Sequence, residues 1–173
     1  MTQPARNRAL DHLDAFAGEW EAEATHPLIP DTVFRGRSTF EWLDGGHFLI
    51  WRMADYDRPG IPNGLAILGC HDADDADGSD GTDSSGPSSD SPEGCTMHYF
   101  DERGVFRVYQ FGAEQGVWRF WRNRPNFSQR YVYTLSADGD TISGGGELSR
   151  DGTTWEPDLQ MTFRRVKQAE SRR

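Results

Sequence analysis

Hydrophobic and polar residues alternate along most of the chain, which predicts β-strands rather than helices. In segment 157–166, polar residues separate Leu159, Met161 and Phe163. Such a period of two places successive side chains on opposite faces of a strand. Many similar segments are rich in β-branched and aromatic residues. We therefore expect ten strands, at residues 19–26, 32–43, 48–56, 64–71, 95–101, 105–112, 117–123, 128–136, 141–149 and 157–166.

The segment before these strands has a helical pattern instead. Over residues 7–17, Leu10, Leu13 and either Phe16 or Ala17 recur at three- and four-residue steps and form one apolar stripe. Gly18 follows, and glycine often stands just after the end of a helix. We expect a short helix that ends there.

Short turns join many of the successive strands, so neighbouring strands should be antiparallel. Several strands, such as 117–122, carry bulky residues on both faces. A closed barrel can bury one of these faces inside, and closure also removes exposed strand edges. We predict an all-β fold, a ten-stranded antiparallel up-and-down β-barrel with a short N-terminal helix, as one domain over residues 1–173. Ten strands enclose more space than eight, so we expect an internal cavity.

The negative charge of the chain is concentrated in one segment. The net charge of −10 over 173 residues disfavours nucleic acids and anionic membranes as partners. Residues 72–94 hold seven Asp, one Glu and no Lys or Arg, so this segment accounts for all but two of the ten net negative charges. It has almost no apolar residues to repay the entropy of ordering. We expect a disordered acidic loop insertion there, and a flexible tail over 167–173.

Composition also bears on the environment of the protein. The chain has 17 Arg but a single Lys, together with an excess of acidic residues, as in halophilic proteins. A GC-rich genome, which favours Arg over Lys, is the alternative explanation. No segment approaches the roughly 20 apolar residues of a membrane helix, and the N-terminus lacks the apolar region of a secretory signal. We expect a cytoplasmic protein.

Two cysteines flank the acidic segment. Cys70 and Cys95 stand near the ends of successive predicted strands, so a disulfide between them is geometrically reasonable. Because disulfides are rare in the cytoplasm, we expect free, buried thiols instead. Zinc bound by these cysteines with His71 and His98 is a third alternative, but the period of two turns adjacent ligands to opposite faces.

Five segments, considered together, resemble a known family. They are GEWEAEATHP, VFRGRSTFEWLDGGHFLIWR, MHYFDERGVFRVYQF, WRFWRNRPNFSQRY and DLQMTFRRV. In order and spacing they are similar to small lipocalin-like (calycin) β-barrel proteins. They are more distantly similar to nitrobindin and to fatty-acid-binding-protein-like barrels. The resemblance covers residues 12 to 166 and omits only the acidic insert.

The nitrobindin resemblance makes a specific statement about haem. It implies a haem-ligating histidine on the last strand, but the matching positions here are Asp158 and Gln160. Neither is an imidazole ligand of the kind that haem iron takes. We therefore expect no cofactor. Another imidazole, His26 or His98, is the alternative iron ligand.

The candidate ligand contacts combine aromatic walls with polar groups. Trp20 should close one end of the barrel, and His26, on the same face of the first strand, should lie at its mouth. The alternative for His26 is that it caps the strand end by bonding a backbone carbonyl. Arginines that point inward could hold an anionic group. The candidates are Trp20, His26, Arg52, His98, Arg107, Tyr109, Trp121 and Tyr131.

The sequence has no motif of an established catalytic site. It lacks a G-x-S-x-G nucleophile motif, a P-loop and a dinucleotide fingerprint. We therefore expect a small-molecule binding protein, with a partly apolar ligand that carries an anionic group. One alternative is a nitrobindin-type haem protein that acts on reactive nitrogen or oxygen species. Another is a filled barrel that serves only as a homodimer or interaction partner.

Overall fold

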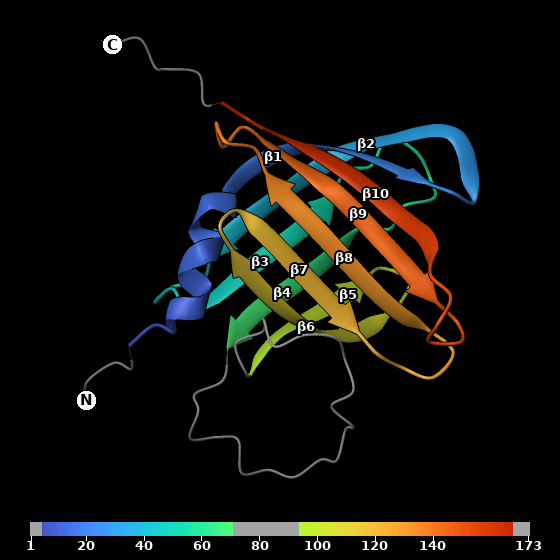
Figure 1. The fold of residues 1–173 in the computed structure, drawn as a ribbon. Coiled ribbons are helices and arrows are strands. Elements are labelled where there is room, and N and C mark those ends of the chain that lie inside the picture. Colours follow the sequence, from blue (N-terminus) through green and yellow to red (C-terminus); the bar gives the residue numbers. More distant parts are fainter. Residues whose placement is uncertain (1–4, 71–93, 168–173) are drawn as a thin grey trace.

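The computed structural model describes residues 5–70 and 94–167, and in it ten antiparallel strands close into a barrel (Figure 1). Each strand pairs with its neighbours in the sequence, and the first strand pairs with the last. The elements are the 3₁₀-helix η1 (Arg8–Phe16) and the strands β1 (Gly18–His26), β2 (Ile29–Trp42), β3 (Phe48–Ala54), β4 (Gly64–Cys70), β5 (Cys95–Asp101), β6 (Phe106–Glu114), β7 (Val117–Arg122), β8 (Ser128–Leu135), β9 (Thr141–Ser149) and β10 (Glu156–Arg165). The predicted fold class is confirmed.

Alternation along the strands divides the inside of the barrel from its outside. On β1, Trp20, Ala22 and Ala24 are each 1% exposed. Glu19, before Trp20, and Glu21, between Trp20 and Ala22, are exposed. The same period of two recurs around the barrel and fills the interior with aromatic and aliphatic side chains. The hydrophobic core therefore lies inside the barrel, as the alternation predicts.

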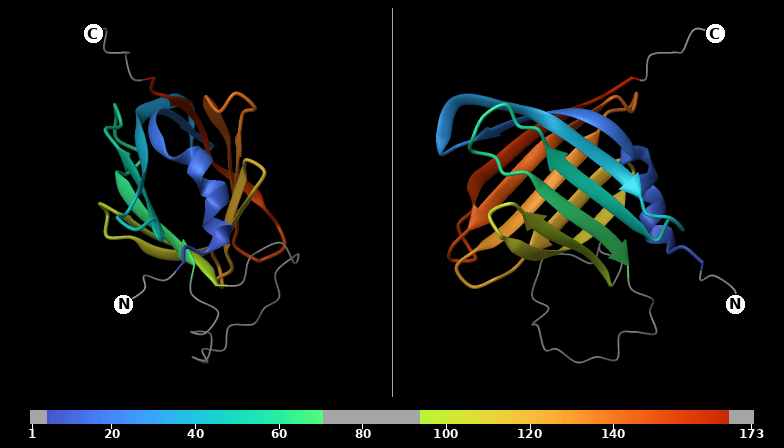
Figure 2. Two further views of the ribbon diagram at one scale, coloured as in Figure 1. Left: turned by 90° about the vertical axis from the view of Figure 1, so that its left-hand side faces the viewer. Right: turned by 180° about the vertical axis from the view of Figure 1, so that it is seen from behind.

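Helix η1 covers one end of the barrel (Figure 2). Its three apolar residues, Leu10, Leu13 and Phe16, are at most 1% exposed and form the floor of the barrel. Their spacing of three matches the three residues per turn of a 3₁₀-helix, which stacks them on one edge. Burying such side chains stabilises the fold by roughly 2 kcal/mol each. The predicted helix is present, and Gly18, with φ of 128°, opens β1 directly behind it.

A tryptophan and an arginine join this helix to the barrel wall. The Nε1–H of Trp20 donates a hydrogen bond to the carbonyl of Phe16 at 2.9 Å. The guanidinium of Arg165, on β10, lies 4.1 Å from the centre of the Trp20 ring. It also donates hydrogen bonds to the carbonyls of Ala15 and Ala17, at the C-terminal end of the helix. The contacts connect η1 to the two strands that close the barrel.

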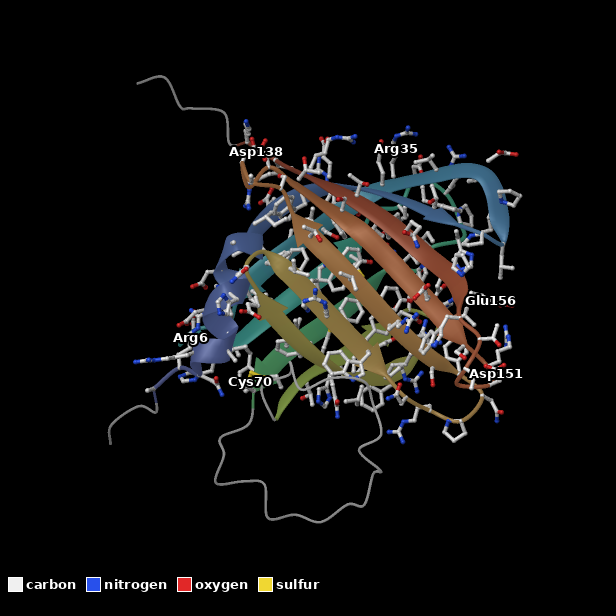
Figure 3. All side chains as sticks on the ribbon, viewed as in Figure 1. Arg6, Arg35, Cys70, Asp138, Asp151 and Glu156 are labelled. Carbon is white, nitrogen blue, oxygen red and sulfur yellow. A yellow bond between two sulfur atoms is a disulfide. The ribbon has the colours of Figure 1, made fainter. Side chains whose placement is uncertain are left out.

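The connections that follow odd-numbered strands all lie at the end opposite η1. This follows from the up-and-down topology, in which β1, β3, β5, β7 and β9 all run away from the helix. Figure 3 shows Asp151 and Glu156, beside the β9–β10 connection, at that end, and Cys70 at the end near η1. One end of the barrel is therefore closed by the helix, and the other is bordered only by strand connections.

Cys70 and Cys95 form a disulfide, so the expectation of free thiols is wrong. The two residues are direct cross-strand partners on β4 and β5, with Cα atoms 3.9 Å apart. The expected zinc alternative fails as well, because the sulfurs bond each other. Disulfides persist mainly in oxidising compartments. The cytoplasmic location therefore stays a prediction, and the bridge weighs against it.

Two predicted features fall largely outside the described residues. Of the acidic insertion 72–94 only Gly94 is described, and of the tail 167–173 only Lys167. Within 5–70 and 94–167, no helix has the length and apolar character needed to cross a membrane.

Candidate functional site

A cavity of about 310 Å³ lies inside the barrel and reaches the end away from η1. The side chains that fill the barrel near η1 therefore leave space toward its other end, contrary to the filled-barrel alternative. Its wall is largely apolar and includes Trp51, Met53, Met97, Phe120 and Met161. The polar side chains lie mainly on the side of the cavity wall that is formed by β1, β6, β8 and β10.

Asp158 on β10 is the centre of these polar groups. The residue is only 6% exposed. Its Oδ2 accepts hydrogen bonds from the Tyr131 hydroxyl and from Nε2 of Gln129, both at 2.8 Å. Its Oδ1 lies 3.1 Å from Nε2 of His26. Three donors from β1 and β8 therefore surround this buried carboxylate, as buried charge requires.

A local irregularity of β10 turns Asp158 inward. The register between β10 and β9 shifts between Pro157 and Gln160, which indicates a β-bulge. Met161 and Phe163 point into the barrel, so a regular period of two would turn Asp158 outward and Leu159 inward. Because of the bulge, both Asp158 and Leu159 line the cavity.

Gln129 connects Asp158 to a second part of the wall. Its Oε1 accepts hydrogen bonds from Nη1 of Arg107 at 3.0 Å and from the Tyr109 hydroxyl at 2.8 Å. Its Nε2 donates to Asp158 and lies 2.9 Å from the Tyr131 oxygen. The amide orientation follows, since its oxygen faces two donors and its nitrogen faces acceptors. A continuous hydrogen-bonded chain thus runs from Arg107 on β6 to Asp158 on β10.

His26 ends the chain of hydrogen bonds on β1. Its Nδ1 lies 3.1 Å from the backbone nitrogen of Leu28, and a backbone N–H can only donate. The ring proton therefore sits on Nε2 and is donated to Asp158. The expected alternative of a carbonyl partner is wrong, because the two partners of His26 are an amide N–H and a carboxylate.

The tyrosines of the cavity are held in their neutral form. Burial raises the pKa of Tyr109, Tyr131 and Tyr133. The nearby Asp158 carboxylate raises the pKa of each of them further. Burial also raises the pKa of Tyr56 to about 12. All four hydroxyls can therefore donate hydrogen bonds near neutral pH.

Two glycines of β9 leave room for polar side chains of the neighbouring strands β8 and β10. A Cβ at Gly146 would overlap the ring of Tyr131, its cross-strand partner on β8. A Cβ at Gly145 would likewise overlap the amide of Gln160. Gly146 therefore lets the Tyr131 ring lie flat on the neighbouring strand, where its hydroxyl reaches Asp158.

Two arginines face the cavity without a carboxylate partner among the described residues. Arg107 is half-buried, and its guanidinium lies 4.8 Å from the centre of the Phe127 ring. Within residues 5–70 and 94–167, its side-chain hydrogen bond is formed by Nη1, with Gln129. Arg150, at the β9–β10 connection, lines the cavity and is exposed. Since Asp158 is the one acidic residue of the described lining, these arginines give it a net positive charge.

A third arginine of the lining, Arg103, is neutralised by Asp101. Its Nη2 lies 2.7 Å from Oδ2 of Asp101, which also accepts a hydrogen bond from the Tyr99 hydroxyl at 2.9 Å. Burial raises the pKa of the Asp101 carboxyl, but the hydrogen bonds from Arg103 and Tyr99 outweigh burial and lower this pKa to about 2. The charge of Arg103 is therefore balanced by Asp101, and Arg103 is a weaker candidate for binding an anionic ligand.

Four of the eight residues predicted from the sequence line this cavity: His26, Arg107, Tyr109 and Tyr131. Trp20 does not line it, since its ring is buried at the η1 end, under Arg165. This position agrees with the expectation that Trp20 closes one end of the barrel.

The other three predicted residues point away from the cavity, so their assignment to its wall is corrected. Arg52 is exposed because its neighbours on β3, Trp51 and Met53, occupy the inner face. His98 follows the inward Met97 and packs outside against Phe106, with ring centres 6.1 Å apart. Trp121 follows the inward Phe120 and is likewise on the outer face.

Four further polar residues line the cavity but were not predicted from the sequence: Gln129, Asp158, Tyr56 and Tyr133. The sequence carries a signal for three of them. Gln129 and Tyr133 share the face of Tyr131 by the period of two. The nitrobindin resemblance also pointed to Asp158 as the position of a ligand-binding side chain. Tyr56 lies in the irregular segment between β3 and β4, where no periodicity applies.

Within the described part of the chain, no three His, Cys, Asp or Glu side chains come together as metal ligands. The cavity is instead rich in hydroxyl, amide and guanidinium donors. Its polar groups can hold oxygen acceptors of a ligand by hydrogen bonds.

Comparisons with known proteins establish the fold. No protein-family model and no curated protein matches the sequence. Among solved structures, the crystal structure of Rv2717c from M. tuberculosis is similar, with a TM-score of 0.55 and 15% sequence identity. The similarity covers 94% of this chain and 100% of that chain. At this identity the likeness concerns the barrel fold alone.

Proposed function

We propose that the barrel binds a small molecule with an apolar body and an anionic group. The observation that carries this proposal is the combination of an apolar-walled cavity of about 310 Å³ with Arg107 and Arg150. Neither arginine has a carboxylate partner among the described residues. Ligand pockets of this kind are typically apolar, with a few well-placed polar groups that orient the ligand.

Arg107 is the stronger candidate for the anion contact. It is half-buried, so its interaction with an anion is screened less than that of an exposed arginine. The hydrogen bond to Gln129 and the Phe127 ring fix its guanidinium, while its other N–H groups remain available. Arg150 is exposed and adds mainly to the positive potential at the mouth.

The haem alternative has less support from the same residues. The two positions at which the resemblance implies a haem ligand are Asp158 and Gln160. The carboxylate of Asp158 accepts three hydrogen bonds, and the amide nitrogen of Gln160 donates to backbone carbonyls. Both ring nitrogens of His26 are engaged, one as an acceptor and one as a donor, so neither offers a lone pair to iron. His98 packs on the outer face against Phe106.

A calorimetric titration with two matched probes tests the proposal. 4-Isopropylbenzoate supplies an apolar ring and an anion, and 4-isopropylbenzamide has the same shape without the charge. We expect the wild-type protein to prefer the carboxylate by about tenfold or more, as a charge-assisted hydrogen bond provides. The R107Q variant should lose most of this preference. R52Q, which removes an outward arginine of β3, is the matched control and should keep it.

Two results would contradict the proposal. If the wild-type protein binds both probes with equal affinity, the cavity has no preference for an anion, and this part of the proposal is wrong. Absence of any saturable binding, together with a purified protein that carries no small molecule by native mass spectrometry, would remove ligand binding altogether. Added hemin provides the test of the alternative, since a Soret band that shifts and saturates near one equivalent would favour haem.

A further inference from the structure

Tyr56 carries a hydroxyl that the protein itself does not use. The residue lies between β3 and β4 and lines the cavity, and its hydroxyl oxygen is buried without a hydrogen-bond partner among the described residues. Its ring packs on Gly36 of β2, where an added Cβ would come within 2.7 Å of the ring. This packing holds the ring in place. Buried donors usually have a hydrogen-bond partner, so the unpaired hydroxyl of Tyr56 indicates an acceptor on a ligand.

Tyr133 supplies a second hydroxyl to the wall of this cavity. It is 1% exposed, lies on β8 and lines the same cavity. No side-chain hydrogen bond is formed by its hydroxyl with the described residues, unlike those of Tyr131, Tyr109 and Tyr99, which bond to Asp158, Gln129 and Asp101. Tyr56 and Tyr133 line the same cavity, so a single ligand can contact both residues.

The surroundings of these two hydroxyls favour a neutral acceptor. Burial keeps both neutral, so each offers one O–H donor near neutral pH. Asp158 also raises the pKa of Tyr133, which places Tyr133 in the negative field of that carboxylate. A second anion would be repelled there, whereas an uncharged oxygen could accept both hydrogen bonds.

We infer that the hydroxyls of Tyr56 and Tyr133 form a second polar subsite, which donates hydrogen bonds to a carbonyl oxygen of the ligand. This inference rests on the proposed function and deepens it. The ligand is then a compact oxo acid, with its anionic group toward Arg107 and its carbonyl toward the two tyrosines. An aromatic or alicyclic body between them fits the apolar wall around Trp51 and Phe120.

The test compares 4-acetylbenzoate with 4-isopropylbenzoate, in which a methyl group and a hydrogen replace the carbonyl oxygen. In an apolar pocket the acetyl compound binds more weakly, because its carbonyl loses water without compensation. With the subsite, we expect it to bind the wild-type protein about fivefold or more tightly than the isopropyl compound. Y56F and Y133F should each reduce this ratio by about fivefold.

Y99F is the matched control, because Tyr99 lines the same cavity but its hydroxyl bonds to Asp101. It should leave the ratio unchanged. A ratio of affinities is used because a general loss of folding affects both probes equally. If the wild-type protein prefers the isopropyl compound, or if Y56F and Y133F retain the acetyl preference, the inference is overturned while the proposed function stands. If neither benzoate binds, both fail together.

Discussion

Asp158→Asn is the substitution that tests the polar centre of the cavity most directly. The change keeps the shape of the side chain but replaces one acceptor oxygen with an NH₂ group. Asp158 accepts from Gln129 and Tyr131 through Oδ2 and from His26 through Oδ1. An asparagine can keep at most the first two, since its NH₂ group then faces the Nε2–H of the histidine.

A change of tautomer at His26 does not compensate for this loss. Moving its proton from Nε2 to Nδ1 would restore the contact with the introduced amide but would break the hydrogen bond from the Leu28 amide. One hydrogen bond is therefore lost in either case, and the remaining bonds no longer go to a charged carboxylate, which together costs about 1.5–3 kcal/mol. For a domain of this size, this corresponds to a fall in Tm of roughly 5–10 °C.

Urea unfolding at pH 7, followed by tryptophan fluorescence, measures this loss. A double-mutant cycle then separates the pair from general disruption. We expect the cycle of D158N with H26A to give a coupling energy of about 1 kcal/mol or more. The control cycle of D158N with Y99F should give about zero, because Tyr99 shares no hydrogen-bond partner with Asp158. A D158N protein within about 0.5 kcal/mol of the wild type, or equal coupling in both cycles, would refute the reasoning.

Three further predictions concern other parts of the barrel. Gly146→Ala should displace the Tyr131 ring and destabilise the protein by about 1–3 kcal/mol, which thermal unfolding measures. Breaking the Cys70–Cys95 bridge, whose sequence separation is 25, should cost about 3 kcal/mol through the entropy of the unfolded chain. Melting with and without reductant tests this, and an unchanged Tm would contradict it. The pKa of Asp101 is lowered to about 2, so its stabilising effect is present above its ordinary pKa of 3.8 and is lost as the pH falls toward 2. D101N should therefore be less stable than the wild type by at most about 2 kcal/mol at pH 7, and the difference should shrink between pH 4 and pH 2 in urea titrations.

The strands and the closed end of the barrel could be predicted because they depend on local rules. Alternation locates a strand regardless of what it packs against, and short turns make its neighbours antiparallel. The apolar stripe of Leu10, Leu13 and Phe16 needs burial, and the open end of a barrel is the surface available. These features require no knowledge of which strands meet across the interior.

The cavity wall depends on details that alternation does not contain. Asp158 faces inward only because the register of β10 shifts beside it, which reverses the face predicted by a period of two. Arg52 was a candidate for the inner face, but both faces of β3 carry bulky residues, so the pattern does not distinguish the inner face from the outer one. The cysteines were correctly placed as neighbours, and the assumed compartment, rather than the geometry, gave the wrong oxidation state.

Tyr56 allows stability and binding to be distinguished in one variant. A buried hydroxyl without a partner costs about 1–3 kcal/mol, and removing it relieves that cost. Y56F should therefore raise the stability of the ligand-free protein by about 1 kcal/mol, while it weakens binding of 4-acetylbenzoate. Thermal unfolding with and without this probe measures both effects. Residues that reduce stability without a structural role are expected at functional sites. If Y56F instead destabilises the ligand-free protein, the hydroxyl serves the fold, and its assignment to a ligand is wrong.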